Sequence, residues 1–442
     1  MESVLRFRHL LTPQGMLHDH ALVVDAAGKI LRVEKTDGPW DGYLALPGMP
    51  NAHSHAFQRA MSGFGERKQG SDSFWSWREA MYKLAAAITP EQMQAVARLA
   101  FIEMLLAGYT RVAEFHYLHH MPDASRGQEM AAAVIEAAAD TGIGLRFFPV
   151  YYCQGGFDRK TESSQTRFVH ENTDTFLKYI ASLPDCELGI APHSLRAVPA
   201  HALQELVAGA SSMLGQDCLF HIHIAEQQVE VEQCLAATGK RPVQLLADSI
   251  ELSSRWHLVH ATHTNETELQ IISGSGASVV LCPLTEANLG DGLFDAVSFR
   301  NNGGTISIGT DSNCRISVFE EMRMLEYSQR LKNRQRAQLA DESGLGNVLW
   351  KMLSKGGATA CGFACGAIIP GTFADLVVID ETATEKRGHH AENLLDALVI
   401  NGDSNDVSDV YVSGQRIVHA GQHPLHTEAE NRFGSVVRDL FA

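Results

Sequence analysis

Two kinds of hydrophobic pattern divide this chain. Up to about residue 45, short runs alternate between apolar and polar positions, at 4–7, 20–25 and 29–33, with Ala27-Gly28 between the last two. Such alternation is typical of half-buried strands, and the Ala-Gly pair suits a turn between them. The pattern predicts a small β unit, which is too small to be stable without a partner.

From His53 to about residue 320 the pattern changes to apolar runs that alternate with helix-like segments. In the segment 90–107, Thr89 can cap the first turn, a proline occupies the first helical position, and a glycine follows the end. A second helix-like segment, rich in alanine, spans 128–141. The run that leads to His53 is the first predicted strand, and seven more follow at 109–116, 144–150, 187–193, 218–224, 256–260, 277–282 and 305–311.

Eight strands that alternate with helices favour a (β/α)8 barrel. A doubly wound open sheet is the competing fold, and it ranks lower because no Gly-x-Gly-x-x-Gly sequence follows the first strand. Near residue 370 the chain returns to short strands, at 373–380, 397–400 and 407–412, so its two ends share a character that the middle lacks. We predict an α/β fold with a TIM barrel, residues 48–367, beside a small β-sandwich domain built from residues 1–47 and 368–442.

The composition is that of an ordinary globular protein: 442 residues, 45% of them hydrophobic and 20% charged. A net charge of -16 argues against nucleic acid and anionic membranes as partners. No segment is apolar enough to span a bilayer, and residues 1–9 carry no signal-peptide pattern, so we expect a cytoplasmic protein. The eight cysteines are scattered without a Cys-x-x-Cys pair, which indicates free thiols in a reducing compartment.

The stretch 46–55 leads from an apolar run through a Pro/Gly turn to His53 and His55. Residues two apart on a strand point to the same face, so one metal ion can bind both imidazoles. By itself the pair is weak evidence, since surface histidines also pair in this way by chance. The other predicted strands strengthen it, because they too end on ligand or acid/base residues, and barrel strands carry catalytic groups at their carboxyl ends. These residues are Glu114, His116 and Tyr117; Tyr151 and Tyr152; His193 and Arg196; His223 and Glu226; His260 and His263; Thr285 and Glu286; and Asp311.

Four strand-end residues supply three imidazoles and one carboxylate, namely His53, His55, His223 and Asp311. This donor set suits Zn²⁺, with Fe²⁺ as the alternative. We expect one metal ion, because the strand ends where a bridging carboxylated lysine would stand, 150–154 and 190–196, contain no lysine. His221 shares the face of His223 one layer deeper, and we expect it to be a core histidine.

Glu226 and His260 are the acid/base candidates. Glu226 follows His223 by three residues, so it faces the site only if the chain turns as the strand ends; it can then move protons, and otherwise it is a solvated loop carboxylate. His260 ends its strand and can stabilise developing negative charge, with a purely structural role as the alternative.

Several motifs resemble known enzymes. The segments GMPNAHSH, HIHIAE, LVHATH, IGTDS and GTFADLVVID are similar to the amidohydrolase superfamily, in its single-zinc aminohydrolase branch, and the resemblance covers nearly the whole chain. More narrowly, NAHSHAFQRA, SFWSWREAMY, AEFHYLHH, HSLRAV, HIHIAEQ and TEANLGDG resemble the formimidoylglutamate deiminases of histidine degradation. The resemblance implies hydrolysis of N-formimino-L-glutamate to N-formyl-L-glutamate and ammonia.

The resemblance also implies roles for individual residues. It implies one zinc ion at His53, His55, His223 and Asp311, and catalysis by Glu226, His260 and Asp311. It implies substrate contacts from Gln58, Tyr117, His193 and Arg196, with Arg78 as a neighbour. Two arginines suit a small-molecule dicarboxylate, because guanidinium groups bind carboxylates through paired hydrogen bonds and the acidic chain repels anions at long range. For Arg78 the alternative is a surface salt bridge, and for Tyr117 and His193 it is packing in the pocket wall.

The long insert 58–88, with Phe74, Trp75 and Trp77, is interpreted as a lid that excludes water. The nearest alternative function is a related aminohydrolase that deaminates a purine, pterin or similar ring, whose pocket would favour aromatic stacking over two arginines. A barrel without activity, kept as a scaffold, is the third reading, since a fold alone does not prove function. We expect a homodimer.

Overall fold

The computed structural model describes residues 2–66, 73–382, 388–389 and 391–442, and it describes no side chains at 73–76 or 391–392. The tip of the predicted lid, with Phe74 and Trp75, therefore lies outside the described side chains. Among the described residues, no helix is both long and apolar enough to cross a membrane.

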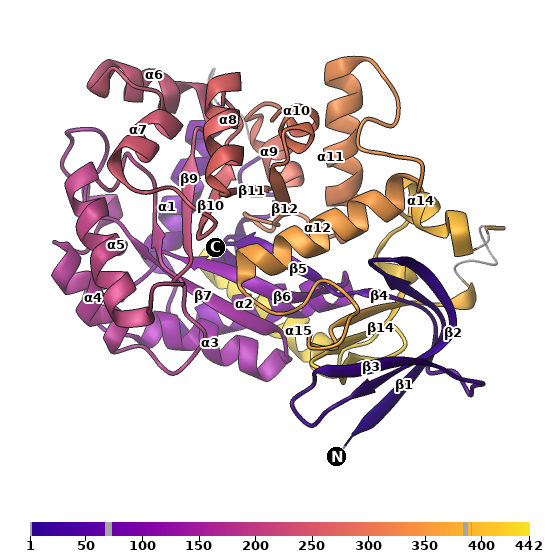
Figure 1. Ribbon diagram of the computed structural model, residues 1–442. Coiled ribbons are helices and arrows are strands. Elements are labelled where there is room, and N and C mark those ends of the chain that lie inside the picture. Colours follow the sequence, from indigo (N-terminus) through magenta and orange to yellow (C-terminus); the bar gives the residue numbers. More distant parts are fainter. Residues whose placement is uncertain (1, 67–72, 383–387, 390) are drawn as a thin grey trace.

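A closed barrel of parallel strands forms the centre of the protein (Figure 1). Strands β5 to β8 pair in order, and so do β9 to β12. Single bridges join the two halves, between Ile190 and Phe220 on one side and between Ser54 and Asp311 on the other. The predicted (β/α)8 barrel is confirmed. Its strands are β5 (Met49–Ser54), β6 (Tyr109–His116), β7 (Gly144–Tyr151), β8 (Ala191–Pro192), β9 (Phe220–Ile224), β10 (Trp256–His260), β11 (Ser278–Leu281) and β12 (Thr305–Ile308).

Helices surround the barrel, and α2 begins where its sequence predicts. The Thr89 side chain accepts a hydrogen bond from the Gln92 backbone N–H, and the Gln92 side chain accepts one from the Thr89 backbone N–H. Two otherwise unpaired N–H groups are therefore satisfied. The helices in this part of the chain are α1 (Ser73–Ala87), α2 (Pro90–Leu106), α3 (Glu129–Thr141), α4 (Thr173–Ala181), α5 (Ala200–Leu214), α6 (Gln228–Thr238), α7 (Pro242–Ser249), α8 (Glu266–Ser275), α9 (Pro283–Leu289), α10 (Ala296–Asn301), α11 (Val318–Asn333) and α12 (Leu345–Cys361).

Strands from both chain ends form a second sheet, as predicted, in the order β15-β14-β13-β4-β1-β2-β3. It is one mixed sheet, whereas a sandwich has two. The Phe7 ring on β1 lies 6.4 Å from the Tyr411 ring on β14, although two strands stand between them, so the sheet curls around its own small core. Its strands are β1 (Ser3–Thr12), β2 (Gly15–Val24), β3 (Ile30–Lys35), β4 (Gly42–Pro47), β13 (Leu376–Ile379), β14 (Val407–Val412) and β15 (Gln415–Val418).

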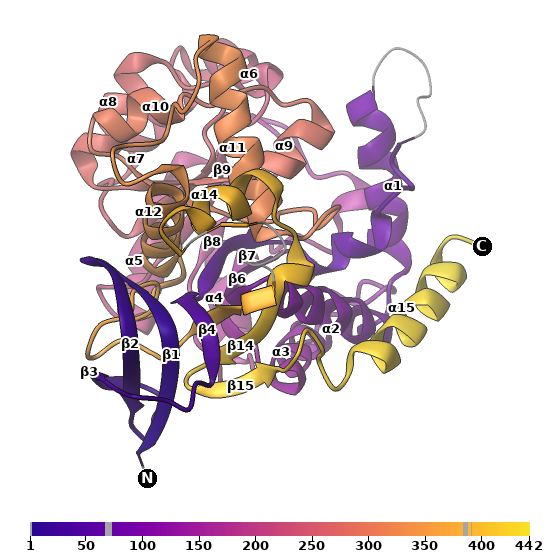
Figure 2. The same ribbon diagram turned by 90° about the vertical axis from the view of Figure 1, so that its right-hand side faces the viewer.

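The strand predicted at 397–400 is wrong, because these residues belong to helix α14 (Ala391–Asn401). Leu394, Leu395, Leu398 and Val399 are buried. Their spacing is that of one helical face, which a four-residue apolar run cannot reveal. Helix α14 packs against α11 and α12, and the last helix, α15 (His426–Leu440), packs against α2 (Figure 2). The predicted domain limits stay a prediction, and these two helices contact barrel helices rather than only the sheet.

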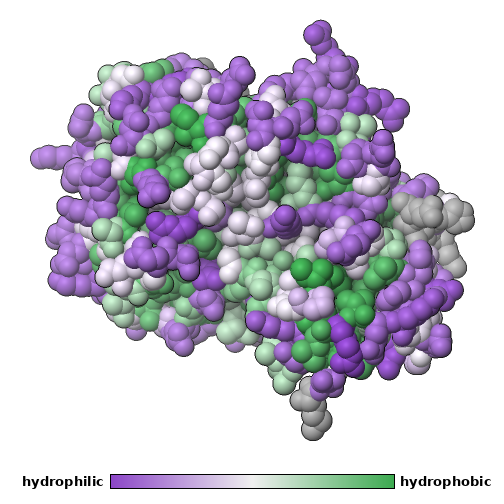
Figure 3. All heavy atoms as spheres, in the orientation of Figure 1, coloured by the Kyte–Doolittle hydropathy of each residue, from purple (hydrophilic) through white to green (hydrophobic). Residues whose placement is uncertain are grey.

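On the face seen in Figure 1, hydrophilic side chains predominate at the rim, and hydrophobic ones lie in patches over the curled sheet and over the barrel (Figure 3). Arg111 of β6 connects the barrel with the curled sheet. It donates to the Asp375 carboxylate, and its guanidinium also lies against the rings of Phe363 and Phe373. The buried ion pair ties the end sheet to the barrel that carries the site.

Candidate active site

Three histidine rings meet at the carboxyl ends of β5 and β9. The Nε2 atom of His53 lies 3.2 Å from Nε2 of His55 and 3.1 Å from Nε2 of His223. Asp311, just beyond β12, completes the group, and one ligand atom from each of the four residues lies within 4.8 Å of the others. The structure thus brings all four predicted metal ligands to one point.

The protonation of these rings fits a cation. Nδ1 of His55 lies 2.8 Å from the Phe115 carbonyl oxygen, and Nδ1 of His223 lies 3.2 Å from the His193 carbonyl oxygen. A carbonyl can only accept, so each Nδ1 carries the proton and each Nε2 presents a lone pair. Burial lowers the pKa of all three rings, that of His53 to about 3, so they are neutral. Facing lone pairs repel unless a shared cation binds them, and three imidazoles with one carboxylate suit a divalent transition metal.

Asp311 faces two ways. Its Oδ1 lies 3.6 Å from His53 Nε2 and 3.2 Å from His55 Nε2, while its Oδ2 lies 3.8 Å from Nε2 of His260. Burial opposes its charge, but the surrounding histidines outweigh burial and lower the pKa of Asp311. Its backbone φ of 45° is unusual for a residue other than glycine, which indicates a strained position held by its neighbours.

Two asparagines hold this strained corner. The Asn51 Oδ1 accepts from the Thr310 backbone N–H at 3.1 Å, and Asn313 Nδ2 donates to Ser54 Oγ at 3.1 Å and to the His55 carbonyl at 3.0 Å. Sequence reasoning did not single out these residues. The available signal was position, since each is a buried polar residue two places from a metal ligand.

His260 stands between carboxylates. Its Nδ1 lies 3.1 Å from Glu286 Oε1, and its Nε2 lies 4.0 Å from Glu226 Oε1. Burial opposes protonation of the ring, but the attraction of Glu226, Glu286 and Asp311 outweighs burial and raises the pKa of His260 to about 10. The ring is therefore a buried cation that can donate from Nε2. Glu286 appeared in the sequence only as a strand-end residue without a role.

Glu226 reaches the site because the chain turns after β9. Ala225 has a φ of 50°, in the left-handed region, and the Glu230 carboxylate accepts the Glu226 backbone N–H at 3.1 Å. The turn that Glu226 needs is therefore present. Burial raises the pKa of Glu226, against the attraction of His260 and Arg196, so its carboxyl can exchange a proton closer to neutral pH than an exposed one.

Gln58, Tyr117 and His193 lie close to one another beside the metal ligands. Gln58 Nε2 donates to the Tyr117 hydroxyl at 2.6 Å, and Gln58 Oε1 is buried without a hydrogen-bond partner in the described part of the chain. The Tyr117 ring lies 5.0 Å from the His55 ring and 5.9 Å from the His193 ring. These side chains form a wall directly beside the metal ligands.

The two arginines approach from different elements. Arg78 of α1 donates from Nε and Nη2 to the Tyr82 hydroxyl, at 3.1 and 2.7 Å. Arg196 follows β8, and its Nη2 lies 3.9 Å from Glu230 Oε2. Burial lowers the pKa of His193, and Arg196 and Arg78 both lower it further, so both cations act on the same pocket wall.

Tyr152 lies beside His193, and in the sequence it was only a strand-end residue without an assigned role. Its ring lies 4.9 Å from the His193 ring, and its hydroxyl accepts from Gln165 Nε2 at 2.7 Å. Burial raises the pKa of Tyr152 to about 12, while Arg196 and Arg78 oppose that rise. The tyrosine therefore lies within the field of both arginines.

The prediction that His221 is a core histidine is confirmed. Its Nε2 lies 2.9 Å from the Ala360 carbonyl oxygen, and its ring packs 4.0 Å from the Phe148 ring. It is fully buried below the metal ligands and takes no part in the site.

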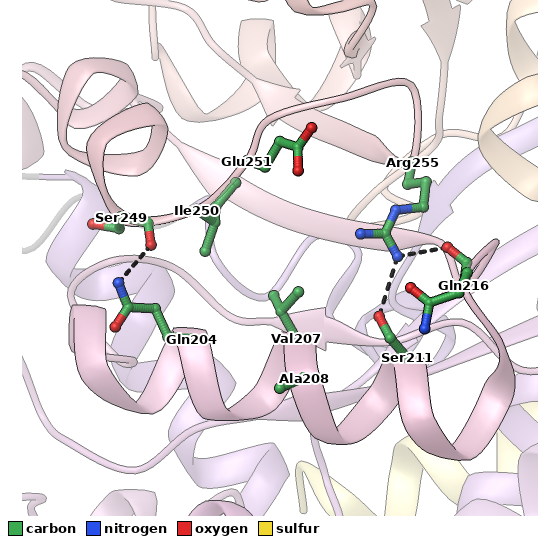
Figure 4. Close-up of a pocket in the computed structure, with 9 residues that line it drawn as sticks. All are labelled: Gln204, Val207, Ala208, Ser211, Gln216, Ser249, Ile250, Glu251 and Arg255. Carbon is green, nitrogen blue, oxygen red and sulfur yellow. Dashed lines mark hydrogen bonds between the residues drawn. The ribbon is translucent and has the colours of Figure 1, made fainter.

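A surface hollow of about 390 Å³ lies elsewhere, against α5 and the segment that follows α7 (Figure 4). Several of its polar groups are paired with one another: Gln204 Nε2 donates to the Ser249 carbonyl, and Arg255 Nη1 donates to Ser211 Oγ and to the Gln216 carbonyl. No group in it converges on a common point, so the chemistry belongs to the strand ends.

A barrel that gathers three histidines and an aspartate at its strand ends defines a metal-dependent hydrolase. The chain belongs to the amidohydrolase family, whose model matches residues 44–417. It is 39% identical to a formimidoylglutamate deiminase of Pseudomonas aeruginosa, over the full length of both chains. It is 30% identical to a 5-methylthioadenosine/S-adenosylhomocysteine deaminase of Halobacterium salinarum, over 84% of this chain and 82% of that one. A crystal structure of an amidohydrolase from Brucella melitensis superposes with a TM-score of 0.92 at 39% identity, covering 99% of this chain and 100% of the other.

Proposed function

We propose that this protein hydrolyses N-formimino-L-glutamate to N-formyl-L-glutamate and ammonia. The observation that carries the proposal is the full-length, 39% identity to a formimidoylglutamate deiminase. The site supports it independently, because two arginines on separate elements face the pocket wall beside the metal ligands. A small dicarboxylate needs such a pair, since the chain carries a net charge of -16.

We propose Zn²⁺ as the metal, with Fe²⁺ as the alternative, held by His53, His55, His223 and Asp311. A metal bound there supplies a Lewis acid that lowers the pKa of water toward neutrality. The neutral imidazoles of His55 and His223 keep their Nε2 lone pairs for it, because their Nδ1 protons are engaged by backbone carbonyls.

Three residues of the chain then move protons and stabilise charge. Asp311 accepts the proton of the attacking water at Oδ2, the oxygen that faces His260. The protonated His260 ring donates from Nε2 toward the attacking oxygen, which carries charge as it bonds to the formimino carbon. Glu226, with a raised pKa, delivers a proton to the nitrogen that leaves as ammonia.

Arg196 and Arg78 hold the two carboxylates of the substrate, and Gln58 and Tyr117 orient the formimino head beside the ligands. Replacing Arg196 by methionine keeps most of the aliphatic stem of the side chain and removes the guanidinium group with its charge. We expect KM to rise about 10²-fold, the cost of removing a partly buried charged contact, with metal content unchanged. Arg336→Met, which makes the same substitution at an exposed position, is the matched control.

The proposed activity is tested by ammonia release from N-formimino-L-glutamate, measured beside adenosine, guanine and 5-methylthioadenosine on the same metal-assayed preparation. Release from formiminoglutamate alone is the expected result. Turnover of a purine instead would establish the second candidate, a ring-deaminating aminohydrolase, which the 30% identity to a methylthioadenosine deaminase favours. A stable, metal-loaded protein without activity on the whole panel would contradict both.

The predicted homodimer and cytoplasmic location stay predictions. Light scattering of the purified protein and microscopy of a tagged chain test them. Nucleic acid and membranes remain unexpected as partners, because of the net charge of -16.

A further inference from the structure

Glu230 lies between Glu226, the proposed proton donor, and Arg196, the proposed carboxylate anchor. It lies in the first turn of α6, only 2% exposed. Its Oε2 accepts the Glu226 backbone N–H at 3.1 Å and lies 3.9 Å from Arg196 Nη2. Its other oxygen, Oε1, is buried and has no hydrogen-bond partner among the residues that the structure describes. The same carboxylate oxygen of Glu230 therefore faces both the Glu226 backbone N–H and the Arg196 guanidinium.

At the catalytic end, Glu230 fixes a turn. The left-handed Ala225 redirects the chain after the metal ligand His223, and this places Glu226 Oε1 4.0 Å from His260 Nε2. A left-handed alanine is strained and persists only where its surroundings hold it. The Glu230 carboxylate supplies that restraint, since it accepts the N–H of the residue directly after the strained one.

On its other side, Glu230 faces the Arg196 guanidinium, whose orientation few other described groups fix. The Arg196 side chain is 28% exposed, and its buried Nε has no hydrogen-bond partner within the described residues. Burial lowers the pKa of Arg196, and Glu230 is the strongest of the charges that overcome burial and raise it, ahead of Glu226. Bidentate recognition of a carboxylate needs the guanidinium plane held in one orientation.

We propose that Glu230 is a positioning residue with two separable roles. Its negative charge orients Arg196 for the substrate carboxylate. Its side-chain oxygen accepts the Glu226 backbone N–H and so holds Glu226 in place for proton transfer. The inference rests on the proposed function for its substrate. A carboxylate performs both roles, whereas an amide performs only the second, because it can accept the Glu226 N–H without carrying charge. Alanine performs neither.

The test compares Glu230→Gln and Glu230→Ala with the matched control Glu232→Gln, which removes the same charge from an exposed position on the same helix. With N-formimino-L-glutamate, we expect Glu230→Gln to raise KM about tenfold, as for loss of a partly buried charge pair, and to leave kcat within about threefold. Glu230→Ala is expected to raise KM similarly and also to lower kcat about 10²-fold, the scale of a misplaced catalytic group. The control keeps wild-type values.

A readout without turnover separates this inference from the proposed reaction. Calorimetry of glutarate, an inert dicarboxylate, is expected to give a dissociation constant about tenfold weaker in both Glu230 variants than in Glu232→Gln. If wild type binds glutarate but does not hydrolyse formiminoglutamate, the proposed function fails, and the calorimetry still decides the role of Glu230 toward Arg196.

Two results would overturn the proposal. One is equal glutarate affinity in Glu230→Gln and the control. The other is a parallel loss of kcat in the glutamine and alanine variants at constant KM, which indicates a structural role and would be accompanied by a lower Tm. Metal content and circular dichroism, measured on every variant, identify a protein that has not folded.

Discussion

The barrel carries two buried clusters of histidine, and they differ in where their ring nitrogens point. In the metal cluster, His53, His55 and His223, the Nε2 atoms converge to 3.1–3.2 Å. In the second cluster, His119, His120 and His170, the ring centroids lie 4.9–6.3 Å apart, against 4.7–5.4 Å in the metal cluster, so the spacing of the rings does not separate the two. Nε2 of His119 bonds the Val150 carbonyl at 2.7 Å, and Nε2 of His120 bonds the Val169 carbonyl at 2.9 Å.

The difference shows that several histidines close together in the sequence do not by themselves make a metal site. The stretch HYLHH packs three histidines into residues 116–120, against two in the stretch HSH. Burial lowers the pKa of the rings in both clusters, so their protonation is alike. What differs is that the strand fixes His53 and His55 on one face, while 119 and 120 follow β6 in a loop and turn to backbone carbonyls.

The largest expected effect comes from removing one converging nitrogen. His223→Ala leaves two imidazoles and a carboxylate, and we expect bound metal to fall well below one per chain and activity to fall more than about 10³-fold, since water activation depends on the metal. Elemental analysis and ammonia release measure the two losses. In the second cluster, His170→Ala should retain full metal content; a loss of metal there would erase the distinction between the clusters.

Asp311→Asn tests whether Asp311 is both a metal ligand and the base that accepts a proton. The amide oxygen can still face His53 and His55, but the side chain no longer accepts a proton on the side of His260. We expect kcat to fall about 10²- to 10⁴-fold, the range for loss of a general base, while part of the metal remains. Full activity in this variant would refute the assignment of Asp311 as base.

A buried histidine of the second cluster is expected to affect stability alone. His119→Ala removes two hydrogen bonds, to Tyr179 and to the Val150 carbonyl, from a fully buried site. The free energy of unfolding should fall by about 2–4 kcal/mol, from lost bonds and a cavity. Urea unfolding measures the loss, and unchanged kcat in the folded protein shows that the cluster has no catalytic part.

The barrel and its ligands could be predicted because their signals are local. Strand β10 has the predicted limits, 256–260, and each metal ligand follows an apolar run. Strand β8, expected at 187–193, is a regular strand only over Ala191–Pro192. The preceding residues still pair with both neighbouring strands, but through the isolated bridges of Leu188 and Ile190.

The supporting residues could not be predicted, because their partners are remote in sequence. Asn51 bonds Thr310, 259 residues away, and Glu230 meets Arg196 from a different strand end. Hydrophobic periodicity carries no information on such pairs. A sequence shows that a polar residue stands near a ligand, and only the closed barrel shows what that residue contacts.

The smallest expected effect is a dependence of stability on pH. Burial lowers the pKa of His170 to about 3, below its ordinary value near 6.5. Between these values the unfolded chain binds a proton that the folded one does not, so stability falls as the pH falls from 6.5 toward 3. One such histidine contributes a slope of about 1.4 kcal/mol per pH unit within that window. His170→Phe should flatten the pH dependence of urea unfolding by that amount between pH values of about 6 and 5, where the unfolded histidine is charged. An unchanged slope would mean that the His170 ring is protonated in the folded protein.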